Sequence, residues 1–485
     1  MFRDKKYHFI GIGGIGMSGL ARILLKFGAV ITGSDMGEGI VLKNLRDLGI
    51  NVKTGHMKEY LSAIPGGVDA VVISAAIPEA NPELAYARQA GLKVVRYAEM
   101  LGIVMSLYRG VAIAGTHGKS TTSGWAAFVL DRLGMCPNYV VGADVNDLAA
   151  SSGVGSGEFF VAEACEYARS FLNLHPTVST VLNVEEDHLD YYRDLDDIID
   201  AFGSFMRGTR TGGKIILNAD DVNYQRLRDD YESKKDQYRS HQIYTFGMNN
   251  PQADYRAQNA VLTSGGGYQF DILFAGRRLG SASLKVPGVH NVYNALAVTA
   301  SLSAAGVGMD KILSVIGDFS GVDRRMTLLK SGKGIRVYDD YAHHPTEIKA
   351  TLSAMRQMCQ FEGCNRLICI FQPHQYSRTR FLIDDFASSF DEADLVIVPE
   401  IYFVRDSEDS LQNVNSQMLV DKINNRCEKL SGRNHQKSEP RALFIETREG
   451  IISEIKNNAT SGDVIITMGA GDIWKVADAI VQWLR

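Results

Sequence analysis

Residues 111–122 read V-A-I-A-G-T-H-G-K-S-T-T, and this stretch decides the fold of the central part of the chain. It describes a buried strand that runs into a glycine-bounded turn and then into a helix, an arrangement that holds phosphate on backbone N–H groups. Lys119 adds a cation, and the hydroxyl groups after it can bind Mg²⁺. The general phosphate-loop motif has glycine at the position of Ile113, so the turn is shorter here. We predict a nucleotide-phosphate loop rather than an ordinary strand-turn-helix connection.

The chain has 485 residues and a formal net charge of −5, with dispersed basic residues. This length suggests several domains, and the charge gives no sign of a nucleic-acid surface or of a basic membrane anchor. No run of 18 apolar residues is present, and the glycines after the charged start argue against a signal peptide. Six cysteines without a C-x-x-C pair indicate reduced thiols. We expect a cytoplasmic protein that binds no nucleic acid and does not insert into a membrane.

Apolar runs alternate with helical stretches along the chain, which predicts an α/β fold with parallel sheets. We expect three domains. Residues 1–107 form a Rossmann-like parallel sheet, residues 108–320 a phosphate-loop ATPase-type α/β domain, and residues 321–485 a second Rossmann-like α/β domain. The expected strands are residues 8–12, 30–32, 70–74, 94–95, 111–114, 159–162, 180–183, 215–218, 335–338, 367–371, 395–398 and 464–468.

Some segments depart from this alternation. Residues 253–286 contain shorter, glycine-turned strands, which predict a small antiparallel insert in the second domain. Residues 321–325, G-V-D-R-R, read as a linker. Residues 403–441 are polar and predict a loop-rich surface segment. Flexible junctions near residues 108 and 321 suggest that the domains close on their substrates.

A first candidate site follows the first expected strand, where residues 11–16 read G-I-G-G-I-G and open a helix. Asp35 ends the next strand about twenty residues later, as in dinucleotide-binding loops. Any pyrophosphate can bind the N-terminus of such a helix, so a nucleotide-sugar diphosphate suits the loop as well as NAD does. The plainer alternative is that the glycines serve only a tight turn.

A second candidate site combines the phosphate loop with two acidic clusters, E-A-C-E at residues 163–166 and E-E-D-H-L-D at residues 185–190. Each cluster follows an expected strand, and the carboxyl ends of parallel strands converge on the ligand crevice. Carboxylate and imidazole groups there, beside a serine hydroxyl, can hold Mg²⁺ against a transferring phosphate. Taken singly, each cluster is more often a solvated helix start.

A third candidate site lies in the last domain, where residues 339–345 (D-D-Y-A-H-H-P) and 371–380 (F-Q-P-H-Q-Y-S-R-T-R) each follow an expected strand. Arg378 can bind a carboxylate, and His343 or His374 can orient or deprotonate an amine. A single histidine is more often structural. Two adjacent histidines before a proline, opposite a second loop with histidine and arginine, are hard to explain by packing alone.

Six motifs occur in one order: G-I-G-G-I-G-M-S-G, A-G-T-H-G-K-S-T-T, N-x-E-x-D-H-x-D, H-N-x-x-N-A-L-A, D-D-Y-x-H-H-P-T-E and F-Q-P-H-x-Y-S-R-T. With them the chain resembles the Mur ligase family over nearly its whole length, in particular the members that join L-alanine to UDP-N-acetylmuramate. The resemblance implies a cytoplasmic enzyme of bacterial peptidoglycan-precursor synthesis that uses ATP and Mg²⁺. A monomer or weak homodimer is expected.

The resemblance also implies a role for each domain. The first holds UDP-N-acetylmuramate, the second holds ATP, and the third brings the amino acid. The γ-phosphoryl group of ATP passes to the lactyl carboxylate of the sugar, and the amine of alanine attacks the acyl phosphate. UDP-N-acetylmuramoyl-L-alanine, ADP and phosphate result. Phosphorylation gives the carboxylate a good leaving group, while Lys119 and Mg²⁺ neutralise charge on the transferring group.

Carried onto this sequence, the resemblance implies that the catalytic residues are Lys119, His188, His343 and Arg378. The implied metal ligands are Ser120, Glu163 and His188. The implied ATP-binding residues are Gly115, Thr116, His117, Gly118, Lys119, Ser120, Thr121, Asn291, Asn294, Arg325 and Asp340. The implied UDP-sugar site comprises Gly11, Gly13, Gly14, Ile15, Gly16, Met17 and Asp35. The implied amino-acid pocket comprises Tyr341, His343, His374 and Arg378.

The chain departs from the family pattern in two places. Where many members read A-D-E-S-D, residues 164–169 read A-C-E-Y-A-R, which removes two carboxylates, adds a cation and leaves the Mg²⁺ geometry open. Gln375 stands where many members have arginine, which leaves selectivity for alanine over glycine or serine open. Some related ligases carry a carbamylated lysine after the metal-site histidine. No lysine lies between His188 and Lys214, so none is predicted here.

Three other functions are compatible with parts of the sequence. A recycling ligase that joins a tripeptide to the same sugar shares the ATP machinery, but its first glycine loop differs from this one. An NAD-dependent oxidoreductase would leave the phosphate loop and the last domain unexplained. A non-catalytic nucleotide-binding regulator is conceivable because of the departures near Glu163 and at Gln375. Amino-acid-dependent phosphate release would exclude that regulator.

Overall fold

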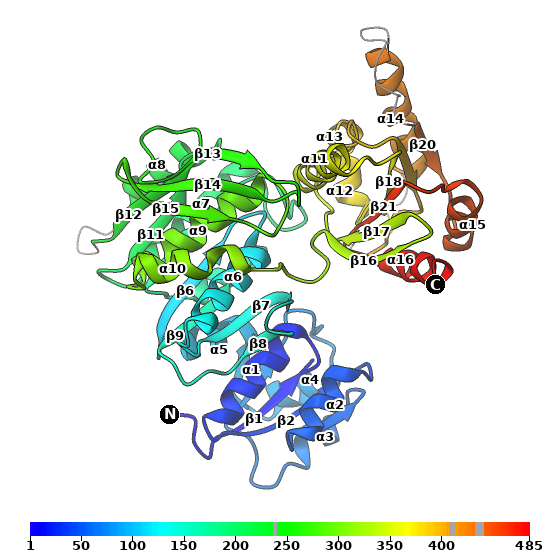
Figure 1. The fold of residues 1–485 in the computed structure, drawn as a ribbon. Coiled ribbons are helices and arrows are strands. Elements are labelled where there is room, and N and C mark those ends of the chain that lie inside the picture. The colour runs from blue at the N-terminus through cyan, green and yellow to red at the C-terminus, as the bar shows by residue number, and fades with distance from the viewer. Residues whose placement is uncertain (236–239, 405, 407–412, 432–440) are drawn as a thin grey trace.

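The computed structural model describes residues 1–235, 240–404, 406, 413–431 and 441–485. Three β-sheets follow one another along the chain, and helices pack on each of them (Figure 1). This architecture confirms the predicted α/β class with three α/β units. Within the described residues, no helix is both long enough and apolar enough to cross a membrane.

The first sheet has the order β3-β2-β1-β4-β5 and is parallel throughout, as predicted. Its strands are β1 (Lys6–Ile10), β2 (Val30–Asp35), β3 (Asn51–Thr54), β4 (Ala70–Ile73) and β5 (Val94–Arg96). Its helices are α1 (Ile15–Lys26), α2 (Ile40–Asp47), α3 (Lys58–Ser62), α4 (Pro82–Gln89) and α5 (Tyr97–Met105). The edge strand β3 lies outside the predicted strands, because only its Val52 is buried and no apolar run marks it.

The second sheet has the order β15-β14-β13-β12-β11-β10-β6-β9-β7-β8. Its strands are β6 (Arg109–Ala114), β7 (Asn138–Val145), β8 (Ala150–Gly153), β9 (Phe159–Glu163), β10 (Val178–Val181), β11 (Lys214–Asn218), β12 (Gln242–Gly247), β13 (Tyr255–Leu262), β14 (Tyr268–Phe274) and β15 (Arg277–Ser283). Its helices are α6 (Lys119–Arg132), α7 (Leu195–Arg207), α8 (Tyr224–Lys234), α9 (His290–Ala304) and α10 (Met309–Val315), with the 3₁₀ helices η1 (Tyr167–Asn173) and η2 (Ile316–Asp318).

The strands predicted for residues 253–286 are present and antiparallel to one another, and they belong to the central sheet. β13, β14 and β15 pair with one another, and β13 joins β12 in parallel where Tyr255 lies opposite Phe246. Phe270 and Ile272 on β14 are buried in the same apolar core as α6 and α9. Because these strands share that core, they extend the central sheet at its edge.

The third sheet has the order β16-β17-β21-β18-β19-β20 and is mixed, because β16 pairs antiparallel with β17. Its strands are β16 (Thr327–Gly332), β17 (Ile335–Asp340), β18 (Leu367–Phe371), β19 (Leu395–Val398), β20 (Arg441–Phe444) and β21 (Val464–Met468). Its helices are α11 (Pro345–Glu362), α12 (Tyr376–Phe381), α13 (Ile383–Ala387), α14 (Ser416–Ser431), α15 (Arg448–Asn458) and α16 (Trp474–Trp483). The four strands predicted for this part are confirmed.

Helix α14 corrects the prediction of a loop-rich segment at residues 403–441. Its Leu419, Val420 and Ile423 are buried against the core of the third sheet. Their spacing places them on one apolar face of a helix. A prediction from composition misses such a face, because most residues around it are polar. The remaining part of that prediction lies partly outside the described residues, at 405, 407–412 and 432–440.

The first sheet is docked on the second through α1, which contacts β7 and β8. Gly19 permits this contact, because a Cβ there would lie only 2.7 Å from Cβ of Ser152. Apolar side chains of both units form one continuous core. In Figure 1 the C-terminal unit lies beside the central one, with α11 and α12 on the side that faces it.

Candidate active site

The turn between β6 and α6 has a geometry that strongly favours glycine at its last position. Gly118 has a left-handed φ of +81° and directly precedes α6, and a Cβ there would lie 2.9 Å from Oδ1 of Asn294. Nζ of Lys119 donates hydrogen bonds back to the carbonyl oxygen of Gly115 at 2.6 Å and to Oε1 of Glu166 at 2.8 Å. Burial lowers the pKa of Lys119, but the Glu166 carboxylate outweighs it and raises the pKa above its ordinary value. The loop therefore carries a fixed positive charge.

The predicted metal ligands Ser120, Glu163 and His188 line one wall of a shared cavity. Oγ of Ser120 donates to Oε2 of Glu163 at 2.8 Å, and the N–H of Gly142 donates to the same oxygen at 2.7 Å. Neighbouring oxygens around octahedral Mg²⁺ are about 2.9 Å apart, because each lies about 2.05 Å from the ion. The Ser120 and Glu163 oxygens therefore fit one edge of a Mg²⁺ site.

Arg169, the cation that the A-C-E-Y-A-R sequence adds, does not line this cavity. Arg169 instead pairs with Asp197 at 2.7 Å and with Asp200 at 3.5 Å on α7. Ala168 and Arg169 have left-handed backbone conformations, which turn the chain away at this point. Glu166 remains as the carboxylate that contacts Lys119. The departure thus keeps one carboxylate at the loop and neutralises the new charge elsewhere.

A first cavity of about 680 Å³ lies between the phosphate loop, α9 and the start of the C-terminal unit. Asp340 lies in its wall, and burial raises the pKa of Asp340 to about 6 although Arg325 opposes the shift. The predicted ATP-binding residues that line it are His117, Gly118, Thr121, Asn291, Asn294, Arg325 and Asp340. Thr116, Lys119 and Ser120 line the second cavity instead, and Gly115 lines neither of the two.

The second cavity, of about 670 Å³, lies between α1, α2, the phosphate loop and the C-terminal unit. Of the predicted UDP-sugar residues, Ile15 lines it. Ser18 and Arg22, which the sequence reading did not single out, line it too. They follow Ile15 at helical spacing, three and seven residues later, so the same face of α1 carries all of them.

The other predicted UDP-sugar residues do not line the second cavity, but several of them fix the conformation of the loop before α1. Oδ2 of Asp35 accepts a hydrogen bond from the N–H of Gly13 at 2.8 Å. At Gly16 a Cβ would lie 2.5 Å from the hydroxyl of Tyr97, so the helix start needs glycine there. Met17 is buried in the apolar core. Gly14 directly precedes α1, and Gly11 turns the chain with a φ of +80°.

The predicted amino-acid pocket is divided between two cavities. Tyr341 and His343 line the second cavity, whereas Arg378 lines a third of about 50 Å³ together with Gln375. His374 packs beside them, with its Nδ1 3.5 Å from Nη1 of Arg378. The second and third cavities share the residues Asp187 and His188 in their walls.

Arg378 forms a buried ion pair with Asp187, Nη2 to Oδ1 at 2.7 Å. Burial alone would raise the pKa of Asp187, but Arg378 and the neighbouring histidines hold it well below its usual range. Oδ2 of Asp187 also lies 3.8 Å from Nε2 of His188. The third cavity therefore has the Arg378 cation beside the carboxylate of Asp187, with Glu186 and Asp190 also in its wall, so it offers groups for both ends of a free amino acid.

Glu347 on α11 connects the two sides of the site, although the sequence reading gave it no role. Its carboxylate lies 3.1 Å from Nη1 of Arg325 and 3.5 Å from Nδ1 of His117. Oε2 of Glu347 accepts a hydrogen bond from the N–H of His343 at 3.1 Å. Arg325 and the histidines hold its pKa well below the ordinary value although burial opposes them. The sequence signal was its place as the last residue of the motif D-D-Y-x-H-H-P-T-E.

His117 and Glu185 form a second link of this kind, with Nε2 of His117 3.5 Å from Oε2 of Glu185. Burial lowers the pKa of His117, but the carboxylates of Glu185 and Glu347 outweigh it and raise the pKa to about 9. Burial raises the pKa of Glu185, and His117 opposes this and brings it to about 2. His117 therefore carries a positive charge between two carboxylates at neutral pH.

The first and second cavities meet at the phosphate loop. Gly118, Arg325 and Glu347 line both of them. A phosphate that extends from the first cavity and an acceptor that lies in the second would therefore meet beside Lys119. This arrangement suits transfer of a phosphoryl group between two large bound molecules.

Three family models match consecutive parts of the chain. The model described as Mur ligase family, catalytic domain, matches residues 6–109. The Mur ligase middle domain matches residues 113–302, and the Mur ligase, glutamate ligase domain, matches residues 324–471.

Full-length relatives and solved structures agree with these models. A UDP-N-acetylmuramate–L-alanine ligase of Acetivibrio thermocellus is 38% identical over 479 residues, which are 99% of this chain and 96% of the relative. A ligase of the same name from Pelotomaculum thermopropionicum is 38% identical over 489 residues, covering 100% and 99%. The crystal structure of UDP-N-acetylmuramate-alanine ligase from Thermotoga maritima has a TM-score of 0.76 at 27% identity, covering 99% and 98%. A murein peptide ligase from Psychrobacter arcticus has a TM-score of 0.68 at 25% identity, covering 99% and 98%. The chain belongs to the Mur ligase family.

Proposed function

We propose that the protein joins L-alanine to the lactyl carboxylate of UDP-N-acetylmuramate at the expense of ATP, in peptidoglycan-precursor synthesis. The observation that carries the proposal is that Gly118, Arg325 and Glu347 line both of two nucleotide-sized cavities, which therefore adjoin at these residues. The γ-phosphate of ATP and the carboxylate of the sugar can meet there. Relatives named as L-alanine ligases match the chain from end to end, which supports this substrate pair.

Each cavity receives one substrate in this proposal. ATP occupies the first cavity, with its phosphates at the loop of Gly118 and Lys119. UDP-N-acetylmuramate occupies the second cavity, between α1, α2 and the same loop. Alanine occupies the third cavity, where Arg378 binds its carboxylate and Asp187 its ammonium group. With one substrate in each cavity, the reacting atoms would lie where the three units meet.

The reaction needs activation because a carboxylate is a poor electrophile. An oxygen of the sugar carboxylate attacks the γ-phosphorus, the bond to the β-phosphate oxygen breaks, and ADP departs. The alanine ammonium loses a proton to solvent, and the free amine attacks the acyl carbon; inorganic phosphate leaves with the electron pair of the broken C–O bond and takes up the further proton released from nitrogen. Lys119 and Arg325 place positive charge beside the transferring group, where charge develops. Ser120, Glu163 and His188 would hold Mg²⁺, which adds positive charge against the phosphate oxygens when bound.

His343 orients the amine rather than accepting its proton in this proposal. Burial, and to a smaller extent Arg378, lower the pKa of His343 to about 3. A base is most effective when its pKa lies near the working pH, so this neutral imidazole is a weak general base. It can still accept a hydrogen bond, which aligns the amine for attack.

Phosphate release tests the proposal. Release from ATP and Mg²⁺ is measured with UDP-N-acetylmuramate while the amino acid is varied. We expect release to require both the sugar nucleotide and L-alanine. Lys119→Ala should lower the rate at least about 100-fold, because removal of one preorganised charge or donor at the reacting group typically costs that much. Lys58→Ala removes a lysine whose side chain is 66% exposed and should leave the rate unchanged.

The other outcomes identify the alternatives. Release with a tripeptide but not with alanine would favour the recycling ligase. If neither an amino acid nor a peptide supports phosphate release, the proposal is rejected and a nucleotide-binding regulator is favoured. We further propose that the enzyme works in the cytoplasm, where its nucleotide substrates are made, as a monomer or weak homodimer.

A further inference from the structure

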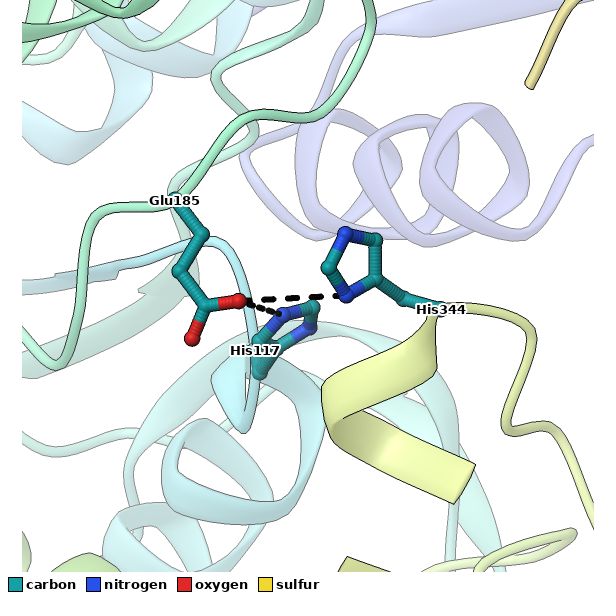
Figure 2. A group of neighbouring side chains, drawn as sticks. All are labelled: His117, Glu185 and His344. Atoms are coloured by element: carbon teal, nitrogen blue, oxygen red, sulfur yellow. Dashed lines mark ion pairs between the residues drawn. The ribbon is translucent and has the colours of Figure 1, made fainter. Parts of the chain in front are cut away.

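A group of metal-type ligands lies apart from the proposed Mg²⁺ residues. Within the described residues, His117, Glu185 and His344 are the group whose ligand atoms all lie within 4.8 Å of one another. They come from the phosphate loop, the segment after β10 and the residue before α11, and their side chains converge in Figure 2. Oε2 of Glu185 lies 3.5 Å from Nε2 of His117 and 3.8 Å from Nδ1 of His344.

Both histidines are held by contacts that leave an inward nitrogen available. Nδ1 of His117 faces Oε1 of Glu347 at 3.5 Å. Among the described residues, none makes a hydrogen bond to the buried Nε2 of His117. Nε2 of His344 lies 3.3 Å from the carbonyl oxygen of Glu186, which can only accept, so the neutral ring carries its proton there. The lone pair of His344 is therefore on Nδ1, the nitrogen that faces Glu185.

The carboxylate of Glu185 is oriented in the same way. Oγ1 of Thr346 donates to its Oε2 at 2.6 Å, which leaves a second lone pair on that oxygen. The N–H of Thr346 also lies 3.4 Å from Nδ1 of His344, a long hydrogen bond that a metal ion would replace. Outer contacts that fix ring and carboxylate orientation are typical of built metal sites.

We propose that His117, Glu185 and His344 form a second metal site, selective for Zn²⁺ or a similar divalent transition metal. Two imidazoles and a carboxylate with one open position are a donor set that zinc uses in proteins. Ligand atoms of tetrahedral zinc lie about 3.3 Å apart, so the two measured pairs are within about 0.5 Å of that arrangement. Mg²⁺ prefers oxygen ligands, so a set in which two of the three donors are imidazole nitrogens favours a transition metal over Mg²⁺. His117 and Glu185 both line the first cavity, so a ligand in that cavity can reach an ion bound to them.

The site joins two units of the molecule. His117 and Glu185 belong to the central unit, and His344 immediately precedes α11 of the C-terminal unit. A bound cation fastens α11 to the phosphate loop. It takes the place of the proton that His117 otherwise holds between the carboxylates of Glu185 and Glu347, so binding releases a proton. Zn²⁺ should therefore stabilise the docked arrangement of the two units.

Calorimetric titration of the metal-free, full-length protein with Zn²⁺, in excess Mg²⁺, tests the proposal. The wild type should bind one Zn²⁺ ion, and Glu185→Gln and His344→Asn should each weaken that binding at least tenfold. Asparagine is a good residue before a helix, so His344→Asn keeps the cap that His344 gives α11 while removing the imidazole. Zn²⁺ should also raise the melting temperature of the wild type, and raise it less in these variants.

Two controls and one spectrum make the outcome decisive. His175→Asn removes a histidine elsewhere on the central unit, and His188→Asn removes the imidazole of the proposed Mg²⁺ site; both should leave Zn²⁺ binding unchanged. Co²⁺ on the wild type should give the strong visible absorption of a four-coordinate ion. Equal Zn²⁺ binding by wild type and Glu185→Gln, loss of binding in His188→Asn, or the weak absorption of six-coordinate Co²⁺ would each overturn the proposal. No ligase substrate is present, so the result is independent of the proposed function.

Discussion

The carboxylate of Glu83 is fully buried in the N-terminal unit and is held by three side chains. It accepts from Ser34 at 2.7 Å and lies 2.6 Å from Nε2 of His8 and 2.9 Å from Nδ1 of His56. The carbonyl oxygen of Ser34 in turn accepts a hydrogen bond from the N–H of Gly11 at 2.9 Å. Glu83 thus supports the strand that holds the first glycine loop in place.

Replacing Glu83 should therefore cost much more than its single charge suggests. We expect Glu83→Ala to lower the free energy of unfolding by about 3 kcal/mol, because it leaves buried partners without an acceptor. Urea unfolding measures the change. Glu79→Ala is the matched control: Glu79 pairs with Arg88 at the surface, and such a pair contributes less than about 1 kcal/mol. Equal losses in the two variants would contradict the expectation.

The effect of Glu83 should also depend on pH with a defined sign. Burial raises its pKa, but the hydrogen bonds from His8 and Ser34 outweigh burial and hold the pKa below its ordinary value. A carboxylate with a lowered pKa stabilises the fold above the unfolded-state pKa of about 4.3 and loses that contribution as pH falls through the folded-state value. The difference between wild type and Glu83→Ala should be constant near neutral pH and shrink in acid.

Motifs identified the residues that carry chemistry, but not which of them would meet. Lys119 and Ser120 begin α6 after β6, and Glu163 ends β9, which pairs with β6 in parallel, so all three lie at one edge of one sheet. Glu347 lies in another unit, and its contacts with His117 and Arg325 depend on how two units dock. A pattern within one segment contains no information about that docking.

At the scale of helices and strands, prediction succeeded for most of the continuous apolar runs, although it missed β7, whose first four residues are buried. β18 and β21 read as continuous apolar runs because both of their faces are covered, whereas the edge strands β3 and β16 have few buried residues. The sequence reading missed these edge strands for that reason. It missed α14 because an apolar face of a helix is diluted by the polar residues between its turns.

Gly102 in α5 offers a test at this scale. A Cβ there would lie 2.0 Å from the carbonyl oxygen of Asn173 in η1, so α5 and η1 pack backbone to backbone. Alanine would gain about 1 kcal/mol of helix propensity, but overpacking typically costs about 1–3 kcal/mol and the obstacle here is rigid backbone. We expect Gly102→Ala to be destabilising by about 2 kcal/mol in thermal or urea unfolding.

A glycine with free space around it provides the comparison. Gly308 precedes α10, and no atom would lie within 4 Å of a Cβ there. Gly308→Ala should destabilise the protein by less than about 1 kcal/mol, since alanine is a poorer residue than glycine before a helix but nothing obstructs the added methyl group. If Gly102→Ala proved as neutral as Gly308→Ala, the close packing of α5 on η1 would be wrong.

For the whole molecule, three consecutive residues after β10 hold the C-terminal unit against the central one. Glu185 accepts from Thr346, the carbonyl of Glu186 faces His344, and Asp187 pairs with Arg378. All of the proposed substrate cavities have walls from this junction. Docking of the two units therefore completes the site, and loss of docking would separate its halves.

Weakening this junction should open the molecule and slow the reaction together. Asp187→Asn combined with Thr346→Val removes the charge that pairs with buried Arg378 and the hydroxyl that orients Glu185. Loss of one partner of a buried ion pair costs about 3–5 kcal/mol, which corresponds to a shift toward the open form of at least about 100-fold. Small-angle scattering should show a larger radius of gyration, and kcat/KM should fall.

A variant of the neighbouring residue Glu186 distinguishes opening of the molecule from a general effect of lost negative charge. Glu186 meets the C-terminal unit through its backbone carbonyl, so Glu186→Gln keeps that contact while removing an acidic group from the same loop. It should leave the radius of gyration near the wild-type value, and this readout alone is the control because the Glu186 side chain also lines the third cavity. A saturating ATP analogue with UDP-N-acetylmuramate should restore the compact form of the double variant, because each ligand contacts residues of both units in the proposed complex. A double variant that stayed compact but inactive would instead place the role of Asp187 in the third cavity itself and not in docking.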